Sequence, residues 1–94
     1  MSILRMPAVK AETGHRSHAS IYLAVKEGLF TKPVLIGSRA VGWPADEVQA
    51  ICAARIAGKS ESELRDLVRK LHATRGDRLA AFLAHAGIVE GSAT

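Results

Sequence analysis

The chain has 94 residues, of which 48% are hydrophobic, and carries a net charge of +4. This length is enough for one domain with a packed core and no more. A single cysteine, Cys52, excludes an intramolecular disulfide. The start of the chain lacks a signal-like run, and no stretch approaches the ~20 apolar residues that span a bilayer. We therefore expect a cytoplasmic protein with no membrane partner.

The positive charge is unevenly distributed along the chain. Residues 1–59 carry eight Lys/Arg and four Asp/Glu, whereas residues 60–94 carry five of each. Electrostatic attraction to phosphate favours such a basic module with a neutral extension, although many soluble domains carry a similar charge.

Two short helices joined by a turn are predicted first. The first covers Pro7–Thr13, with proline in its first turn, and Gly14 ends it. Ser17 caps the second, which runs to Glu27 and is stopped by Gly28. Periodicity alone leaves open whether this pair is a helix-turn-helix unit or an ordinary helical hairpin.

The second predicted helix has two different faces. Ile21 and Ala24 belong to an apolar stripe. His18, Tyr22 and Lys26 recur at i, i+4 and i+8 on another stripe. The helix therefore buries one face and presents a histidine, an aromatic ring and a lysine on another.

A β-hairpin is predicted next. Residues 30–36 and 40–43 are apolar runs on either side of a Gly-Ser turn. Lys32 lies at the base of this hairpin and Arg39 at its tip. Basic side chains on a hairpin beside a helix-turn-helix can reach phosphates or the minor groove, although a charge at a turn is otherwise simply solvated. Trp43 is expected in the core.

A third helix is predicted from Pro44 to Gly58. Its first turn carries Asp46 and Glu47, which suit the helix dipole. Cys52 is expected to be a small buried hydrophobe rather than a nucleophile. The apolar face of this helix comprises Val48, Ile51, Cys52 and Ile56.

Ser60 and Glu63 form a capping-box pattern that begins a fourth helix. We expect this helix to end near Arg75, because Gly76 follows, and a last short helix to cover 79–86 before a frayed tail. The apolar stripe of the fourth helix comprises Leu64, Leu67, Val68 and Leu71. This stripe either packs back onto the third helix or contacts a second copy of the chain.

Enzymatic chemistry finds little support. His15 and His18 have a metal-like spacing, but no acidic residue or cysteine clusters with them. No Ser/His/Asp arrangement or glycine-rich phosphate loop is present. We therefore predict no enzyme, no metal and no cofactor.

A family resemblance rests on the order and spacing of several short segments. They are Ile3-Leu4-Arg5-Met6 with Pro7 and Val9, Thr13-Gly14, Ser20-Ile21-Tyr22, Lys26-Glu27-Gly28-Leu29-Phe30, Lys32-Pro33-Val34, Ile36-Gly37-Ser38-Arg39-Ala40-Val41-Gly42-Trp43 and Asp46-Glu47-Val48. In these segments residues 1–57 resemble the AlpA family of phage-type regulators, relatives of the excisionases of prophages and integrative elements.

The resemblance implies a mainly α fold with a small β-hairpin: a winged helix-turn-helix over 1–59, with 60–94 as a C-terminal helical extension. It implies a bacterial, nucleoid-associated protein that binds double-stranded DNA. Such a protein acts as an excisionase (a recombination directionality factor), with an integrase as partner, or as a transcriptional regulator of integrase and excision genes. A single module buries less than about 1,000 Å² on DNA, so we expect several copies to bind cooperatively. The alternative is a protein-interaction adaptor that uses the amphipathic extension.

The resemblance makes the second helix the recognition helix and the hairpin the wing. Leu23 stands where the family often has a basic residue, which shifts the expected base contacts toward Arg16, Ser17 and His18. An arginine there can donate two hydrogen bonds to guanine. The expected DNA contacts are Arg16, Ser17, His18, Ser20, Tyr22, Lys26, Lys32, Ser38 and Arg39.

Overall fold

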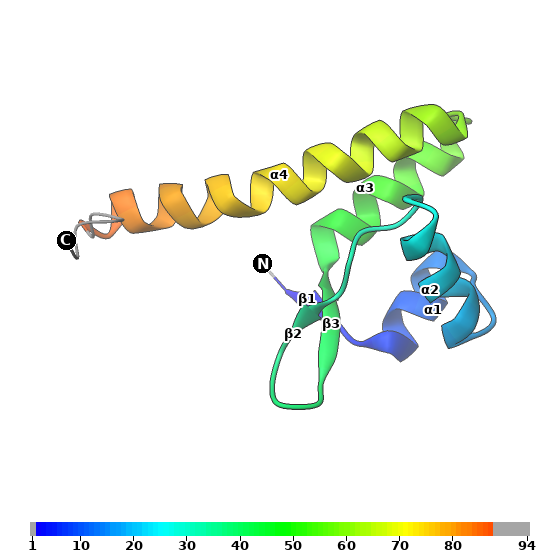
Figure 1. Ribbon diagram of the computed structural model, residues 1–94, viewed down its shortest axis with the longest axis horizontal. Coiled ribbons are helices and arrows are strands. Elements are labelled where there is room, and N and C mark those ends of the chain that lie inside the picture. Colours follow the sequence, from blue (N-terminus) through cyan, green and yellow to red (C-terminus); the bar gives the residue numbers. More distant parts are fainter. Residues whose placement is uncertain (1, 88–94) are drawn as a thin grey trace.

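The computed structural model describes residues 2–87, which form four helices around a small antiparallel sheet (Figure 1). A helix-turn-helix is followed by a β-hairpin and two further helices. This is the predicted winged helix-turn-helix with a C-terminal helix. The elements are β1 (Ile3–Leu4), α1 (Met6–Thr13), α2 (His18–Lys26), β2 (Val34–Leu35), β3 (Val41–Pro44), α3 (Ala45–Ile56) and α4 (Glu61–His85).

The two helices of the helix-turn-helix end where the sequence predicts. Gly14 ends α1 with a φ of 77°. Ser17 caps α2, and its Oγ accepts a hydrogen bond from the Ser20 N–H at 3.1 Å. Gly28 follows α2 with a φ of 77°, a conformation that is strained for any residue with a side chain. Local backbone chemistry therefore fixes this part of the chain.

The sheet has the strand order β1-β3-β2, so β1 adds a third strand to the predicted hairpin. The hairpin is shorter than the sequence predicts, because β2 covers only Val34–Leu35. The preceding residues, Thr31 and Lys32, have backbone groups that bind side chains instead of a neighbouring strand. The wing therefore begins at a segment held by side chains.

The core lies where the sheet meets the four helices. Trp43 is completely buried, as predicted, and its ring centroid lies 5.9 Å from that of Phe30. The buried apolar residues of this cluster are Val9, Ile21, Ala24, Phe30, Trp43, Val48, Ile51 and Val68.

The first half of α4 packs back onto its own chain. Val68 belongs to the core, Leu64 is 3% exposed, and Leu67 and Leu71 are partly buried against the core. Of the two roles that the sequence leaves open for this stripe, the structure shows packing within the chain.

The buried face of α3 differs from the predicted one. Val48 and Ile51 are buried, but Ile56 is 87% exposed. The buried arc extends on the other side to Glu47, so Ile56 falls outside it. Cys52 lies at its edge, half-buried, with its Sγ donating to the Glu12 carbonyl at 3.5 Å. Desolvation and the Glu12 carboxylate raise the pKa of the Cys52 thiol, which disfavours the nucleophilic thiolate.

The prediction that Gly76 ends a helix is wrong, because α4 runs unbroken for 25 residues through that position. No separate helix covers 79–86. Glycine inside a helix costs only about 1 kcal/mol relative to alanine. On either side of it, Arg75 and Arg78 bond to carboxylates of α3, which holds this stretch of helix in place.

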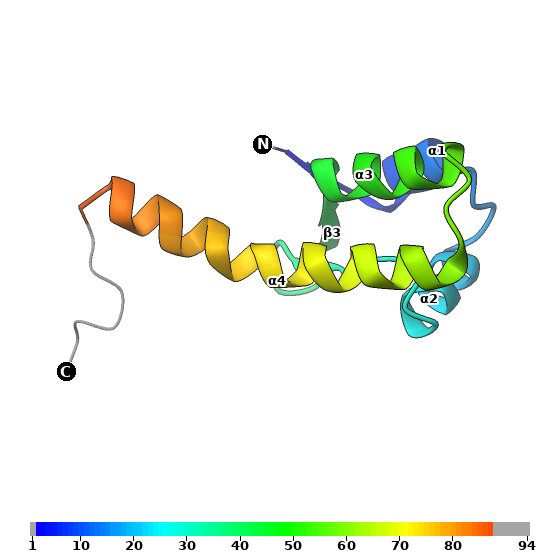
Figure 2. The same cartoon turned by 90° about the horizontal axis from the view of Figure 1, so that it is seen from above.

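The second half of α4 extends beyond the body of the protein (Figures 1 and 2). The predicted frayed tail falls largely on residues 88–94, outside the described residues. Within residues 2–87, no helix combines the length and apolar character needed to cross a membrane.

We expect Gly76→Ala to raise the free energy of unfolding by about 0.5–1 kcal/mol, because alanine reduces the entropy of the unfolded chain. A Cβ at Gly76 would meet no atom within 4 Å. Urea unfolding followed by circular dichroism measures the change. The matched control is Gly58→Ala, which has equal space but a φ of +79° and should destabilise the protein. Equal effects of the two changes would contradict the argument.

Candidate nucleic-acid interface

The exposed side of α2 carries the predicted stripe. His18, Tyr22 and Lys26 are all exposed, whereas Ile21 and Ala24 are buried on the opposite side. Tyr22 is 43% exposed, and the centroid of its ring lies 6.0 Å from that of the buried Trp43. The core therefore supports the aromatic ring in the middle of the stripe.

The first turn of α2 is fixed by its own hydroxyl groups. The Ser20 Oγ donates to the Ser17 carbonyl at 2.9 Å and lies 3.2 Å from the His15 Nδ1. Both serine hydroxyls are thus engaged in local hydrogen bonds. Arg16, in the turn before α2, and His18, its first residue, have exposed side chains.

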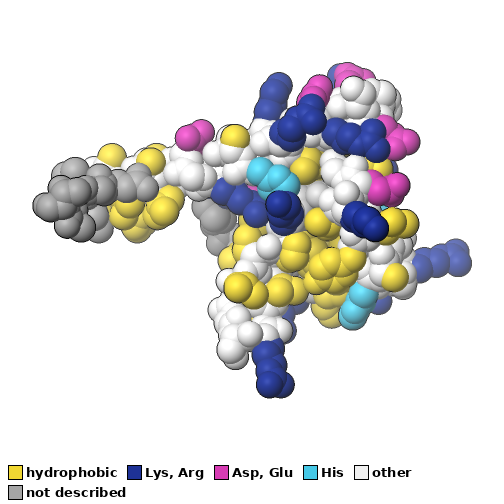
Figure 3. Space-filling view, viewed as in Figure 1, with side chains coloured by type: hydrophobic (Ala, Val, Ile, Leu, Met, Phe, Trp, Pro, Cys, Tyr) yellow, Lys and Arg dark blue, Asp and Glu magenta, His cyan; other side chains and the backbone are white. Residues whose placement is uncertain are grey.

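The loop between β2 and β3 presents the other predicted contacts. Ser38 and Arg39 are exposed in this loop, which projects away from α3 and α4 (Figure 1). The Ala40 carbonyl accepts from the Ile36 N–H at 2.8 Å and closes the loop. A basic side chain marks the tip of the hairpin in Figure 3. The wing therefore offers a hydroxyl and a guanidinium group to solvent.

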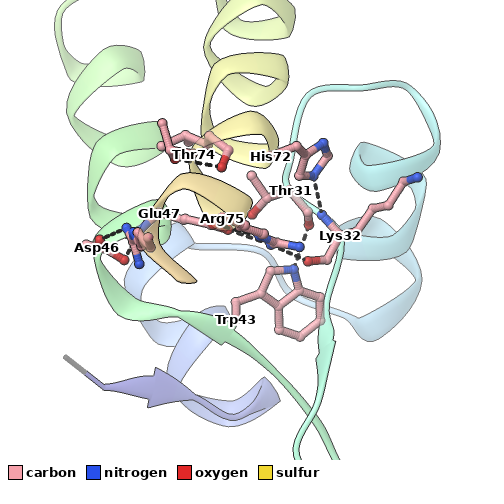
Figure 4. A network of polar contacts seen from close by, with 10 residues as sticks. Thr31, Lys32, Trp43, Asp46, Glu47, His72, Thr74 and Arg75 are labelled. Carbon is pink, nitrogen blue, oxygen red and sulfur yellow. Dashed lines mark hydrogen bonds and ion pairs between the residues drawn. The ribbon is translucent and has the colours of Figure 1, made fainter. Parts of the chain in front are cut away.

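An ion pair between a buried carboxylate and a partly exposed guanidinium joins α3 to α4 near the base of the wing (Figure 4). Glu47 is completely buried, and its two carboxylate oxygens accept hydrogen bonds from the Arg75 Nε and Nη2 at 2.8 Å and 2.6 Å. The Arg75 Nη2 also donates to the Lys32 carbonyl at 2.7 Å. The bonds to Glu47 raise the pKa of Arg75, so its guanidinium stays charged.

His72 holds the other backbone group of Lys32. The Lys32 N–H donates to the His72 Nε2 at 3.0 Å, so this nitrogen carries no proton. Partial burial lowers the pKa of His72, and the charges of Arg75 and Lys32 lower it further against the opposing effect of Glu47. Lys32 therefore has both backbone polar groups bound by α4, while its side chain is exposed and extends away from the network (Figure 4).

Sequence reasoning missed this network. It assigned Glu47 to the helix dipole, although this residue lies four positions before Ile51 on the side of α3 that is buried. A carboxylate on a buried face needs a cationic partner. The basic residues on the facing side of the predicted fourth helix, Arg75 among them, were the available signal.

Among residues 2–87, no three His, Cys, Asp or Glu side chains lie close enough together to hold a metal ion.

Of the predicted DNA contacts, the structure brings Lys26 and Lys32 to the rim of one hollow, beside α4. Ser38 and Arg39 lie apart from them at the tip of the hairpin.

Taken together, a helix-turn-helix with an exposed polar stripe and a wing with a basic tip place the protein in the winged helix-turn-helix class, a fold that is typical of DNA-binding regulators. Residues 2–56 match the family described as "Prophage CP4-57 regulatory protein (AlpA)". This match covers more than half of the chain, so the protein belongs to the AlpA family of prophage regulatory proteins. No curated protein and no solved structure matches the chain. The family match ends at Ile56, the last residue of α3, so α4 lies outside it.

Proposed function

We propose that the protein binds specific double-stranded DNA sequences of a mobile genetic element. In this proposal α2 enters the major groove and the β2–β3 loop contacts the backbone or the minor groove. The observation that carries it is the exposed stripe of His18, Tyr22 and Lys26 on α2, in which the Tyr22 ring packs near the buried Trp43. The chain also belongs to a prophage regulatory family.

The proposed contacts fall into two groups. We propose that Arg16 and His18, which are exposed at the start of α2, contact base edges, because an arginine can bind guanine with two hydrogen bonds. The remaining residues position the protein on the phosphate backbone. These are Ser17, Ser20, Tyr22, Lys26, Lys32, Ser38 and Arg39. To donate to a phosphate oxygen, the Ser20 hydroxyl exchanges its bond to the Ser17 carbonyl for one to the DNA.

Two cellular roles use such a complex. An excisionase coats and bends an attachment site so that an integrase excises the element, and a transcriptional regulator controls the integrase and excision genes. Footprinting on DNA beside an integrase gene, combined with an excision assay with the integrase, separates these roles. Protection of an attachment site together with stimulated excision supports the first role, and protection of a promoter alone supports the second.

We further propose that several copies bind side by side on the DNA. Leu79 and Phe82, on the projecting half of α4, are 53% and 67% exposed. They line an apolar groove together with Ile3 and Val34 of the sheet. This surface also favours the alternative function, a protein-interaction adaptor. Gel shifts on DNA of increasing length test the proposal, and independent stepwise binding would count against it.

We expect Arg39→Ala to weaken DNA binding and to lower its salt dependence. If about four phosphates are contacted, log affinity falls with log salt with a slope of about −3 to −4, and loss of one contact removes about 0.9 of that slope. The control is Arg55→Ala, which removes an exposed cation from α3. Fluorescence anisotropy at several salt concentrations measures both.

Two outcomes would argue against DNA binding as the function. One is an affinity that does not change with salt. The other is that Leu79→Asp abolishes the cellular function, in the excision or regulation assay, while Arg39→Ala leaves it intact. A protein-interaction adaptor predicts this pattern.

A further inference from the structure

A hollow of about 180 Å³ lies between the end of α2 and the first half of α4. We call it the α2–α4 hollow. Phe30 and Val68, which are 2% and 3% exposed, form its apolar floor. Figure 3 shows Lys and Arg side chains gathered around a histidine on this side of the molecule. The hollow is lined by four cations and one histidine and by no carboxylate: Lys26, Lys32, Arg65, Arg69 and His72.

Two of the cationic residues are held to neighbouring elements. The Arg65 Nε donates to the Glu27 carbonyl at 2.9 Å, which ties α4 to the end of α2. The Arg65 side chain also covers Gly28, where an added Cβ would lie 3.5 Å from it. The Lys32 backbone is bound on both sides by α4. These contacts hold the Arg65 side chain and the Lys32 backbone in place beside the hollow.

The acids that pair with these cations lie outside the α2–α4 hollow. Glu61 pairs with Arg65 at 3.6 Å, and Asp66 pairs with Arg69, both along the solvent-exposed surface of α4. Exposed pairs of this kind contribute little free energy, so another anion can replace them. Each oxygen of a phosphate group can accept charge-assisted hydrogen bonds from such donors.

The hollow also continues the surface proposed to face DNA. Lys26 ends the α2 stripe, and Lys32 precedes the first strand of the wing. Arg65 and Arg69 of α4 line the same hollow as these two lysines. Building on the proposed DNA-binding function, we propose that the α2–α4 hollow binds a phosphate group of the DNA backbone. In this way α4, which lies outside the family match, becomes part of the DNA interface.

The sequence contains the signal for this site. Arg65, Arg69 and His72 recur at i, i+4 and i+7, a second stripe on α4 beside its apolar one. The equal numbers of acids and bases in residues 60–94 conceal this clustering, because net charge does not describe which face the charges occupy.

The test compares two single-charge changes on adjacent residues of α4 in the full chain. Arg69→Gln removes a cation from the hollow, and Arg69 is 72% exposed, so the change should leave the fold intact. Lys70→Gln removes an equal charge on the other side of the helix, where Lys70 lines the groove between α3 and α4. The measurement is the affinity for a DNA duplex that the protein protects in footprinting, over a range of salt concentrations.

We expect Arg69→Gln to weaken binding about three- to tenfold and to reduce the salt slope by about 0.9, while Lys70→Gln changes neither. Arg69→Lys, which keeps the charge, should restore the slope. Equal losses in Arg69→Gln and Lys70→Gln would show a general charge effect and overturn the proposal. Unchanged binding by Arg69→Gln would also overturn it.

Two further measurements separate the possible failures. If the unaltered protein binds DNA without salt dependence, the proposed function itself fails, whatever Arg69→Gln does. Inorganic phosphate titrated into the free protein, followed by amide chemical shifts, distinguishes the source of the ligand. Saturation by free phosphate at the hollow, with DNA affinity unchanged in Arg69→Gln, would assign the site to a small anion and overturn the DNA assignment.

Discussion

Arg75→Met is expected to lower the free energy of unfolding by about 3 kcal/mol, because it leaves the buried carboxylate of Glu47 without its partner. Glu47 is 0% exposed, whereas the Arg75 side chain is 26% exposed, so the expected cost lies at the lower end of the range for broken buried pairs. The change also removes the donor to the Lys32 carbonyl. Urea unfolding followed by circular dichroism provides the measurement.

Two further variants identify the cause of this loss. Arg78→Met removes the next arginine along α4, whose pair with Asp46 is more exposed, and should cost less than about 1 kcal/mol. The double change Glu47→Leu with Arg75→Met removes both charges and should recover most of the stability. A double variant as unstable as Arg75→Met alone would show that the buried charge is not the reason.

Trp43→Ala is expected to cost about 3–5 kcal/mol, the usual effect of removing a buried aromatic side chain. The ring is completely buried between Tyr22 and Phe30, with ring centroids 6.0 Å and 5.9 Å away. Its Nε1 donates to the Thr31 carbonyl at 2.7 Å. The change therefore leaves a cavity and an unsatisfied buried acceptor, and thermal unfolding followed by circular dichroism measures the loss.

Trp43→Phe separates these two effects, because it keeps an aromatic ring but removes the N–H donor. Its cost should be smaller than that of Trp43→Ala. Phe82→Ala is the surface control, since Phe82 is 67% exposed, and should change stability by less than about 0.5 kcal/mol. A comparable loss in Phe82→Ala would mean that aromatic content rather than burial determines the effect.

The features that the sequence predicts well are those set by neighbouring residues. Ser17 caps α2, and Gly14 ends α1, because each acts on backbone groups within one turn. Trp43 is buried as expected, because burying its large aromatic ring contributes more to stability than leaving it exposed. The exposed stripe on α2 follows from helical spacing alone.

The features that escaped prediction depend on residues distant in sequence. Glu47 and Arg75 are separated by 28 positions, and neither reveals its partner locally. Gly76 looks like a helix end until the contacts that α4 makes with α3 on either side of it are known. The prediction that Ile56 is buried is wrong for a local reason. The buried side of α3 is shifted toward Glu47, which a search for apolar residues does not include.

The two hydrogen bonds that α4 side chains make with the Lys32 backbone have a consequence for the thermodynamics of recognition. Fixing the backbone of one residue costs about 1–2 kcal/mol of conformational entropy. Because His72 and Arg75 already order Lys32 in the free protein, this cost falls on folding and not on association. In the proposed complex with DNA, the Lys32 side chain therefore loses only its own rotational freedom on meeting a phosphate, and more of the interaction energy is retained as affinity.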